Sequence, residues 1–203
     1  MASPLSREEL FALLEQRIQD PSCARAQDAE VWKTSGVEAA VMVVDLSGFS
    51  RLTRRHGILH FLTIYRRACT IATPLIAAYG GRVVKCMADN VIATFPHPRA
   101  AIEAARALVA ETAALDAVLP ADDRVVVCVG IGYGRFLALA DDIYGDEVNL
   151  AFKLGEDIAR GREILLTEDA HAKLVADGDA VAADDSTIEL GGVRLRYFRL
   201  TGA

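Results

Sequence analysis

Apolar and polar positions alternate differently in the first 36 residues and in the rest of the chain. From Leu5 to Gln19 the apolar side chains recur at helical spacing, and Ser6 with Glu9 forms a capping box at the start of this stretch. The segment from Asp20 to Gly36 is polar and contains a proline, which predicts a connector. We therefore expect an amphipathic helix and a connector to precede the main domain.

The main domain is expected to span residues 37–203, where short β-branched runs alternate with longer helical patterns. The tight link "ADN" between two apolar runs predicts a hairpin. The mixture indicates an α+β fold, with a mostly antiparallel sheet and helices on one face. Strands are predicted at 40–45, 82–87, 91–95, on either side of Gly132–Gly134 within 124–140, at 163–167, 186–190 and 193–200, and helices at 50–79, 98–119, 146–159 and near His171.

Composition narrows the class of protein. With 203 residues, 52% of them apolar, the chain can bury one core of ordinary size, and its formal charge of −6 argues against a protein that coats nucleic acid. No apolar run has the length of a signal sequence or a membrane span, so we expect a soluble, cytoplasmic protein that contacts no membrane. The cysteines lack paired spacing, which is typical of reduced core thiols; they are Cys23, Cys69, Cys86 and Cys128.

Two aspartates stand where apolar strands end. Asp45 lies in "VVDLSGFS", directly before a small-residue turn, and Asp89 lies in the predicted hairpin turn. Each has an ordinary explanation, because Asp45 can cap the following helix and aspartate is common in tight turns. If the two strands are neighbours, however, the carboxylates converge and repel unless cations neutralise them. Magnesium or manganese, which bind carboxylate and phosphate oxygens, are the natural occupants.

Four segments together resemble the signature segments of class III nucleotide cyclases. They are "VVDLSGFSRLT", "GGRVVKCMADNVIATF", "VGIGYGRFLALA" and "DDIYGDEVNLAFKL", and they occur in the family's order and spacing. The resemblance runs from about Val37 to the C-terminus. It implies a ferredoxin-like cyclase fold and a homodimer whose two active sites lie at the subunit interface.

The resemblance also assigns the metal and phosphate contacts. Asp45 and Asp89 match the family's metal-binding pair, which holds two divalent ions, Mn²⁺ or Mg²⁺. One ion would activate the ribose hydroxyl for attack on the α-phosphorus, and the other would stabilise the pyrophosphate leaving group. The backbone amides of Leu46, Ser47, Gly48 and Phe49 would cradle phosphate oxygens.

Three further residues match catalytic or phosphate-binding positions of the family. Arg135 matches an arginine that contacts the terminal phosphates, although a solvated turn residue is the ordinary explanation. Asn149 and Lys153, four residues apart on one helical face, match the residues of the other subunit that orient the ribose and stabilise the transition state. The family usually has arginine where this chain has Lys153, and lysine lacks the bidentate fork. Glycine, furthermore, commonly stands where this chain has Ala88.

Lys85 and Asp142 match the positions that read the base, and lysine with aspartate is the pattern associated with adenine. A donor beside an acceptor can also bind the O4 and N3–H edge of uracil. The chain looks most like the short stand-alone pyrimidine cyclases of bacterial Pycsar anti-phage systems, which favours conversion of UTP to cyclic UMP and pyrophosphate, with the product read by a separate effector. The alternatives are an adenylate cyclase that makes cyclic AMP and a catalytically inactive binding module with the cyclase fold.

Overall fold

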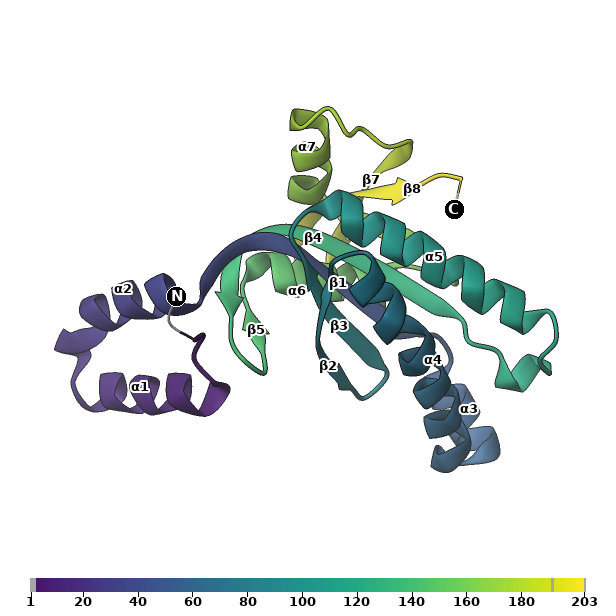
Figure 1. Ribbon diagram of the computed structural model, residues 1–203, viewed down its shortest axis with the longest axis horizontal. Helices are drawn as coiled ribbons and strands as arrows, with labels where there is room; N and C mark the ends of the chain where they lie inside the picture. Colours follow the sequence, from purple (N-terminus) through teal and green to yellow (C-terminus); the bar gives the residue numbers. More distant parts are fainter. Residues whose placement is uncertain (1–2, 191, 203) are drawn as a thin grey trace.

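The computed structural model describes residues 3–190 and 192–202, and its centre is a twisted mixed sheet (Figure 1). The strand order is β2-β3-β1-β4-β6-β8-β7, with β5 paired to the end of β4. Every pairing in these residues is antiparallel except that of β4 with β6, so the sheet is mixed rather than purely antiparallel. The strands are β1 (Gly36–Leu46), β2 (Arg82–Met87), β3 (Asn90–Phe95), β4 (Val127–Ala138), β5 (Ile143–Tyr144), β6 (Ile164–Thr167), β7 (Ala183–Leu190) and β8 (Val193–Leu200).

Helices cover both faces of the sheet, so the expectation of helices on one face was wrong. Met42 and Val44 of β1 point into a core that α4, α5 and α7 close, whereas Val41 and Val43 point into a second core closed by α6. Because successive strand residues face opposite sides, an unbroken apolar run in β1 predicts this double cover. The helical segments are α1 (Arg7–Gln19), η1 (Pro21–Cys23), α2 (Ala24–Ser35), α3 (Phe49–His56), α4 (Ile58–Ala78), α5 (Pro98–Asp116), η2 (Ala121–Asp123), α6 (Asp146–Phe152), η3 (Lys153–Ile158) and α7 (Glu168–Ala176).

β4 is one continuous strand, not the two strands that its glycines suggested. It pairs with β1 without interruption from Val127 to Leu137. The glycines make room for α6: a Cβ atom at Gly130 would lie 2.1 Å from the carbonyl oxygen of Ala151, and one at Gly132 would lie 2.7 Å from that of Glu147. Here glycine therefore permits close helix–sheet packing rather than a turn.

Two predicted helices are subdivided in the structure. The stretch 50–79 is divided by Gly57, whose φ of 86° ends α3 before α4 begins. The stretch 146–159 begins as α6 and continues as η3, a π-helical segment. π-helical turns are rare and occur often at functional sites.

The β2–β3 hairpin forms as predicted, with Met87 paired to Asn90 across the turn. Ala88 adopts a φ of 55°, a left-handed conformation that favours glycine. The departure at Ala88 therefore places strain in the backbone next to Asp89, without removing a functional side chain.

Residues 7–35 form a helical hairpin rather than a helix and a connector. α1 has the predicted capping box, but the segment read as a connector is helical in α2. The hairpin projects from the body beside β5 (Figure 1) and is attached at the turn after β4, where the Leu5 carbonyl accepts from Ala140 N at 2.8 Å and Arg7 N donates to Asp141 Oδ1 at 2.8 Å. Among the described helices, none combines the length and apolar character that a bilayer crossing requires.

The four cysteines are free thiols, but they do not share one environment. Cys69 and Cys128 are buried, as expected of core thiols, whereas Cys23 is half-buried and Cys86 is exposed. The expectation of core thiols is therefore confirmed for only two of them.

Candidate active site

The structure brings Asp45 and Asp89 together at the end of β1. Asp45 is the β1 partner of Asn90, the first residue of β3, and Leu46 N donates to the Asp89 carbonyl oxygen at 3.1 Å. Both side chains are half-buried and line an open hollow of about 580 Å³, which the start of α3 and Glu156 also line. The predicted convergence of the two strand-end carboxylates is therefore confirmed.

The electrostatics of this hollow favour a cation. Burial, together with the negative charges of Asp89, Glu156 and Asp157, raises the pKa of Asp45 to about 7. The described residues contain no group of three or more His, Cys, Asp or Glu side chains arranged to hold a metal by themselves. Two carboxylates that face an open hollow suit Mg²⁺ or Mn²⁺, which commonly take only one or two protein carboxylates and complete their shell with water and phosphate oxygens.

Glu156 is a site residue that the sequence did not reveal. It reaches the hollow from η3, and Asn90 Nδ2 donates to its Oε1 at 2.7 Å. In the sequence Glu156 lies in an acidic helical stretch without a strand end or turn to single it out. The one sequence feature that could have indicated a role for Glu156 is its position seven residues after Asn149, which places it on the same helical face as Asn149 and Lys153.

The amides predicted to cradle phosphate fall into two groups. Leu46 N donates to Asp89 O and Ser47 N donates to Val126 O at 2.9 Å, so backbone carbonyls already occupy both. Gly48 and Phe49 stand at the N-terminus of α3, and their amides have no hydrogen-bond acceptor among the described residues. These two amides are the ones available for an anion, and the helix dipole adds to their attraction.

The predicted base-reading residues are in direct contact. Lys85 Nζ lies 2.6 Å from Asp142 Oδ1, and Asp142 also accepts from Ile143 N at 2.9 Å and from the Tyr144 hydroxyl at 3.1 Å. Burial opposes ionisation of Asp142, but the Lys85 ammonium and these hydrogen bonds outweigh it and hold its pKa below the usual value. The two residues therefore form one fixed donor–acceptor unit.

Arg135 lies far from the aspartates of its own chain. It is paired with Glu38, seven residues before Asp45 on β1, which corresponds to a separation of about 23 Å along the strand. Its guanidinium lies 4.5 Å from the centre of the Trp32 ring. Within a single chain, Arg135 therefore cannot contact phosphates held beside Asp45.

Asn149 and Lys153 are exposed on the helical segment that covers β4. Neither side chain makes a hydrogen bond or ion pair with the described residues. Both are therefore presented to the surroundings rather than used inside the fold, unlike Glu147 on the same helix, which is buried and accepts from Thr167 Oγ1 at 2.7 Å.

Comparisons with known proteins show which proteins this chain resembles in sequence. No protein-family model matches the chain. The adenylate cyclase of Streptomyces coelicolor is 35% identical over 146 residues, 68% of this chain and 37% of that protein, and the adenylate cyclase of Streptomyces griseus is 32% identical over 161 residues, 79% of this chain and 38% of that protein. The chain thus spans less than two fifths of the length of these relatives.

Solved structures show the same fold. An adenylate/guanylate cyclase/hydrolase from Silicibacter pomeroyi superposes with a TM-score of 0.68 at 25% identity, covering 83% of this chain and 98% of that one. The adenylyl cyclase CyaB from P. aeruginosa gives a TM-score of 0.67 at 18% identity over 83% of this chain and 95% of that chain. In both sequence and fold, the chain is similar to the catalytic domains of class III adenylate/guanylate cyclases.

Proposed function

We propose that this chain converts a nucleoside triphosphate to a 3′,5′-cyclic nucleotide and pyrophosphate. The observation that carries the proposal is the pair Asp45 and Asp89, held side by side in an open hollow where burial and neighbouring charge disfavour ionisation of Asp45 unless a cation is present. Gly48 and Phe49, at the start of α3, line the same hollow, and their amides have no acceptor among the described residues. Carboxylates for metal beside donors for phosphate suit a metal-bound triphosphate.

The chain's own groups have distinct tasks in this proposal. Asp45 and Asp89 supply the oxygens that hold Mn²⁺ or Mg²⁺, and the amides of Gly48 and Phe49 donate to phosphate oxygens. When bound, the ions would polarise the phosphate and favour ionisation of the attacking ribose hydroxyl. Glu156, positioned by Asn90, adds negative charge that strengthens cation binding at the pair.

The proposed active form is a homodimer with sites built from both chains. Asn149 and Lys153 are exposed and unused in their own chain, and Arg135 lies about 23 Å along β1 from Asp45. In the dimer, the partner subunit's Asn149 would orient the ribose and the partner subunit's Lys153 would stabilise the charge that develops on the phosphate. A contact between Arg135 and the terminal phosphates likewise requires the second chain.

ATP is the substrate that the base-reading pair favours. Adenine offers an N6–H donor to Asp142 and an N1 acceptor to Lys85, and the relatives from Streptomyces are named adenylate cyclases. UTP is the competing substrate, because uracil O4 and N3–H fit the same donor and acceptor, and the sequence resembles pyrimidine cyclases. Cyclic UMP, an anti-phage role and a separate effector stay predictions that rest on this resemblance.

The decisive experiment incubates the purified protein with Mn²⁺ and ATP, GTP, CTP or UTP in separate reactions, and identifies products by chromatography and mass. We expect cyclic AMP as the main product; cyclic UMP would establish the pyrimidine alternative. Asp45→Ala and Asp89→Ala are expected to abolish product without unfolding the chain, whereas Lys153→Arg should keep activity. Failure to cyclise any nucleotide, combined with metal-dependent nucleotide binding, would establish the inactive binding module instead.

A further inference from the structure

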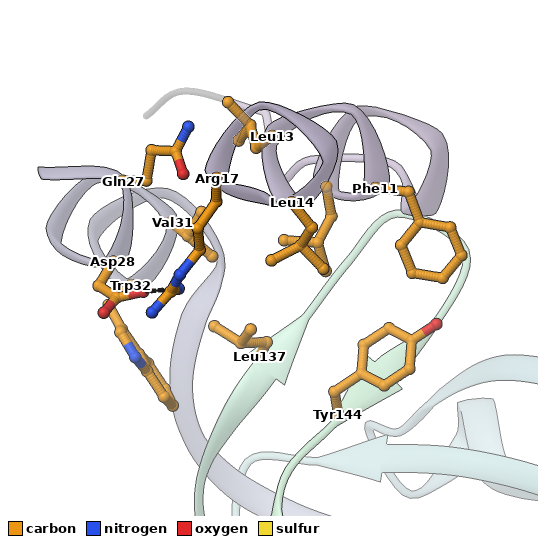
Figure 2. Close-up of a pocket in the computed structure, with 11 residues that line it drawn as sticks. Phe11, Leu13, Leu14, Arg17, Gln27, Asp28, Val31, Trp32, Leu137 and Tyr144 are labelled. Carbon is orange, nitrogen blue, oxygen red and sulfur yellow. Dashed lines mark hydrogen bonds and ion pairs between the residues drawn. The ribbon is translucent and has the colours of Figure 1, made fainter. Parts of the chain in front are cut away.

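A second hollow, of about 350 Å³, lies between the α1–α2 hairpin and the strands β4 and β5 (Figure 2). Its size falls within the range of small-molecule sites. Figure 2 shows aliphatic and aromatic side chains from both helices and both strands around one space. The lining residues, hereafter the hairpin pocket, are Leu10, Phe11, Leu13, Leu14, Arg17, Gln27, Asp28, Val31, Trp32, Leu137 and Tyr144.

The floor of the hairpin pocket is packed, but its wall is exposed. Leu10 and Val31 pack with Leu139 in a small core that fixes the hairpin on the turn after β4. Phe11 and Leu14, by contrast, keep 48% and 39% of their surface exposed. Binding of an apolar molecule in this preformed cavity is favourable, because it removes apolar surface of both the molecule and the cavity from water.

The polar groups at the hairpin pocket define the chemistry of its occupant. Arg17 Nη1 lies 2.6 Å from Asp28 Oδ1, so the charges of the pair cancel (Figure 2). The negative charge of Asp28 would repel a carboxylate ligand. The guanidinium N–H groups of Arg17 that do not contact Asp28 can still donate to a neutral oxygen. The arrangement therefore favours a neutral apolar molecule with one acceptor oxygen.

We propose that the hairpin pocket binds a compact, neutral apolar molecule that carries one hydroxyl or carbonyl oxygen, and that its occupancy is transmitted to Asp142. The pathway is short. The Tyr144 ring lines the pocket while its hydroxyl donates to Asp142, which holds Lys85. α1 also reaches the neighbouring Asp141 through Arg7 N. The part of the proposal that concerns Asp142 rests on the proposed nucleotide function.

The binding test uses an intrinsic probe, because Trp32 is the single tryptophan of the chain and lines the hairpin pocket. The full chain is titrated with menthol, camphor and 1-decanol while the fluorescence of Trp32 is recorded. We expect a saturable change for at least one of them, with a dissociation constant between about 10 µM and 1 mM for a ligand of this size. Absence of a saturable change with all three would overturn the proposal.

Two matched variants on α1 locate the site. Leu14→Asp places a charge in the wall of the hairpin pocket and is expected to weaken binding tenfold or more. Ile18→Asp makes the same kind of change one turn further on, at a side chain that is 79% exposed and outside the lining, and should alter affinity less than twofold. Equal weakening in both variants would overturn the proposal. Conversion of a dimer to a monomer by Leu14→Asp, with no ligand bound by the wild type, would assign the groove to a second copy instead.

Transmission to Asp142 is tested with Tyr144→Phe, which keeps the ring and removes the hydroxyl. The affinity for a non-cyclisable ATP analogue is measured with and without the bound alcohol or ketone. We expect the ligand to change that affinity at least threefold in the wild type and not in Tyr144→Phe. An equal change in both proteins would overturn the proposed route. A wild type that binds the apolar ligand but no nucleotide would refute the proposed function while leaving the pocket intact.

Discussion

At the scale of single residues, the sign of the neighbouring charges distinguishes the two polar centres, around Asp45 and around Asp142. Asp45 is half-buried and lies beside other carboxylates, so its ionised form is disfavoured, whereas the buried Asp142 has Lys85 at 2.6 Å and its ionised form is favoured. The two aspartates thus differ because one has like charges as neighbours and the other has an opposite charge. In the proposed function Asp45 would bind metal, whereas Asp142 is already paired with Lys85.

We expect Mn²⁺ to raise the melting temperature of the wild type, because the ion relieves repulsion around Asp45 and binds only the folded site. Asp45→Asn should remove this shift and should itself melt above the wild type in the presence of a chelator, since it deletes a repelled charge. Differential scanning fluorimetry measures both effects. An Mn²⁺-induced shift that persists in Asp45→Asn would place the metal elsewhere.

The ion pair of Lys85 with Asp142 leads to a pH-dependent prediction. Lys85→Met leaves the buried Asp142 carboxylate without its cation and should lower the free energy of unfolding at pH 7 by about 1–3 kcal/mol. Because the folded pKa of Asp142 is lowered, the contribution is complete above about pH 4 and is lost as pH falls through the folded pKa. Urea unfolding should therefore show a smaller difference between the two proteins at pH 3 than at pH 7.

A surface pair provides the control for this measurement. Arg99 and Glu103 lie four residues apart on α5, 2.9 Å from each other, with both side chains more than 40% exposed. Arg99→Met should cost no more than about 0.5 kcal/mol at pH 7. A cost for Lys85→Met as small as this would contradict a stabilising role for the Lys85–Asp142 pair.

At the scale of elements, the packing of α6 on β4 determines where Asn149 and Lys153 stand. The β4 glycines lie under the helix, and Gly130 is in the closest contact with it. The same packing continues into η3, where a Cβ atom at Gly155 would lie 3.1 Å from the Val43 carbonyl oxygen. The position of Glu156 beside Asp45 thus depends on backbone-to-backbone approach rather than on large side chains.

Gly130→Ala should accordingly destabilise the fold by about 3 kcal/mol or more, because its methyl group would overlap the Ala151 carbonyl and displace α6. Gly178→Ala is the control. Gly178 has open space around it and a φ of 76°, so only backbone strain of about 1–2 kcal/mol is expected. Denaturant unfolding compares the two, and equal costs would show that α6 can move away from β4 freely.

At the scale of the whole molecule, the candidate site is incomplete in one chain. The hollow around Asp45 contains carboxylates and amides, whereas Asn149 on α6 and Lys153 at the start of η3 are exposed and do not line it. In the proposed twofold dimer, each chain would supply the half that the other lacks, so two identical sites would be completed at once.

Complementation tests this arrangement. Asp45→Ala and Lys153→Ala are each expected to be inactive alone. When the two are mixed in equal amounts and allowed to exchange, half of the dimers are mixed and each mixed dimer has one intact site, so activity should reach about a quarter of the wild type. Product formation by a coupled pyrophosphate assay measures it. Continued inactivity after verified subunit exchange would contradict the two-chain site.

The sequence by itself determined the α+β class, the β2–β3 hairpin and the convergence of Asp45 with Asp89. These features depend on local patterns: apolar runs that end in aspartate, and a turn of fixed length between two strands. The similarity to cyclases likewise followed from ordered local segments, and the comparisons support it. Hydrophobic periodicity and turn-forming residues can be recognised in the sequence because both depend on residues that are close together in the chain.

Tertiary structure alone decided the remaining features. The glycines of β4 looked like a strand break because a sequence does not show the helix that packs against them. α2 looked like a connector because it has few buried side chains, and Val31 among them packs against residues distant in the chain, Leu10 on α1 and Leu139 just after β4. Glu156 joined the site, and the hairpin pocket formed, through contacts between elements distant in the chain. Such contacts depend on where elements pack, and no local pattern in the sequence specifies that.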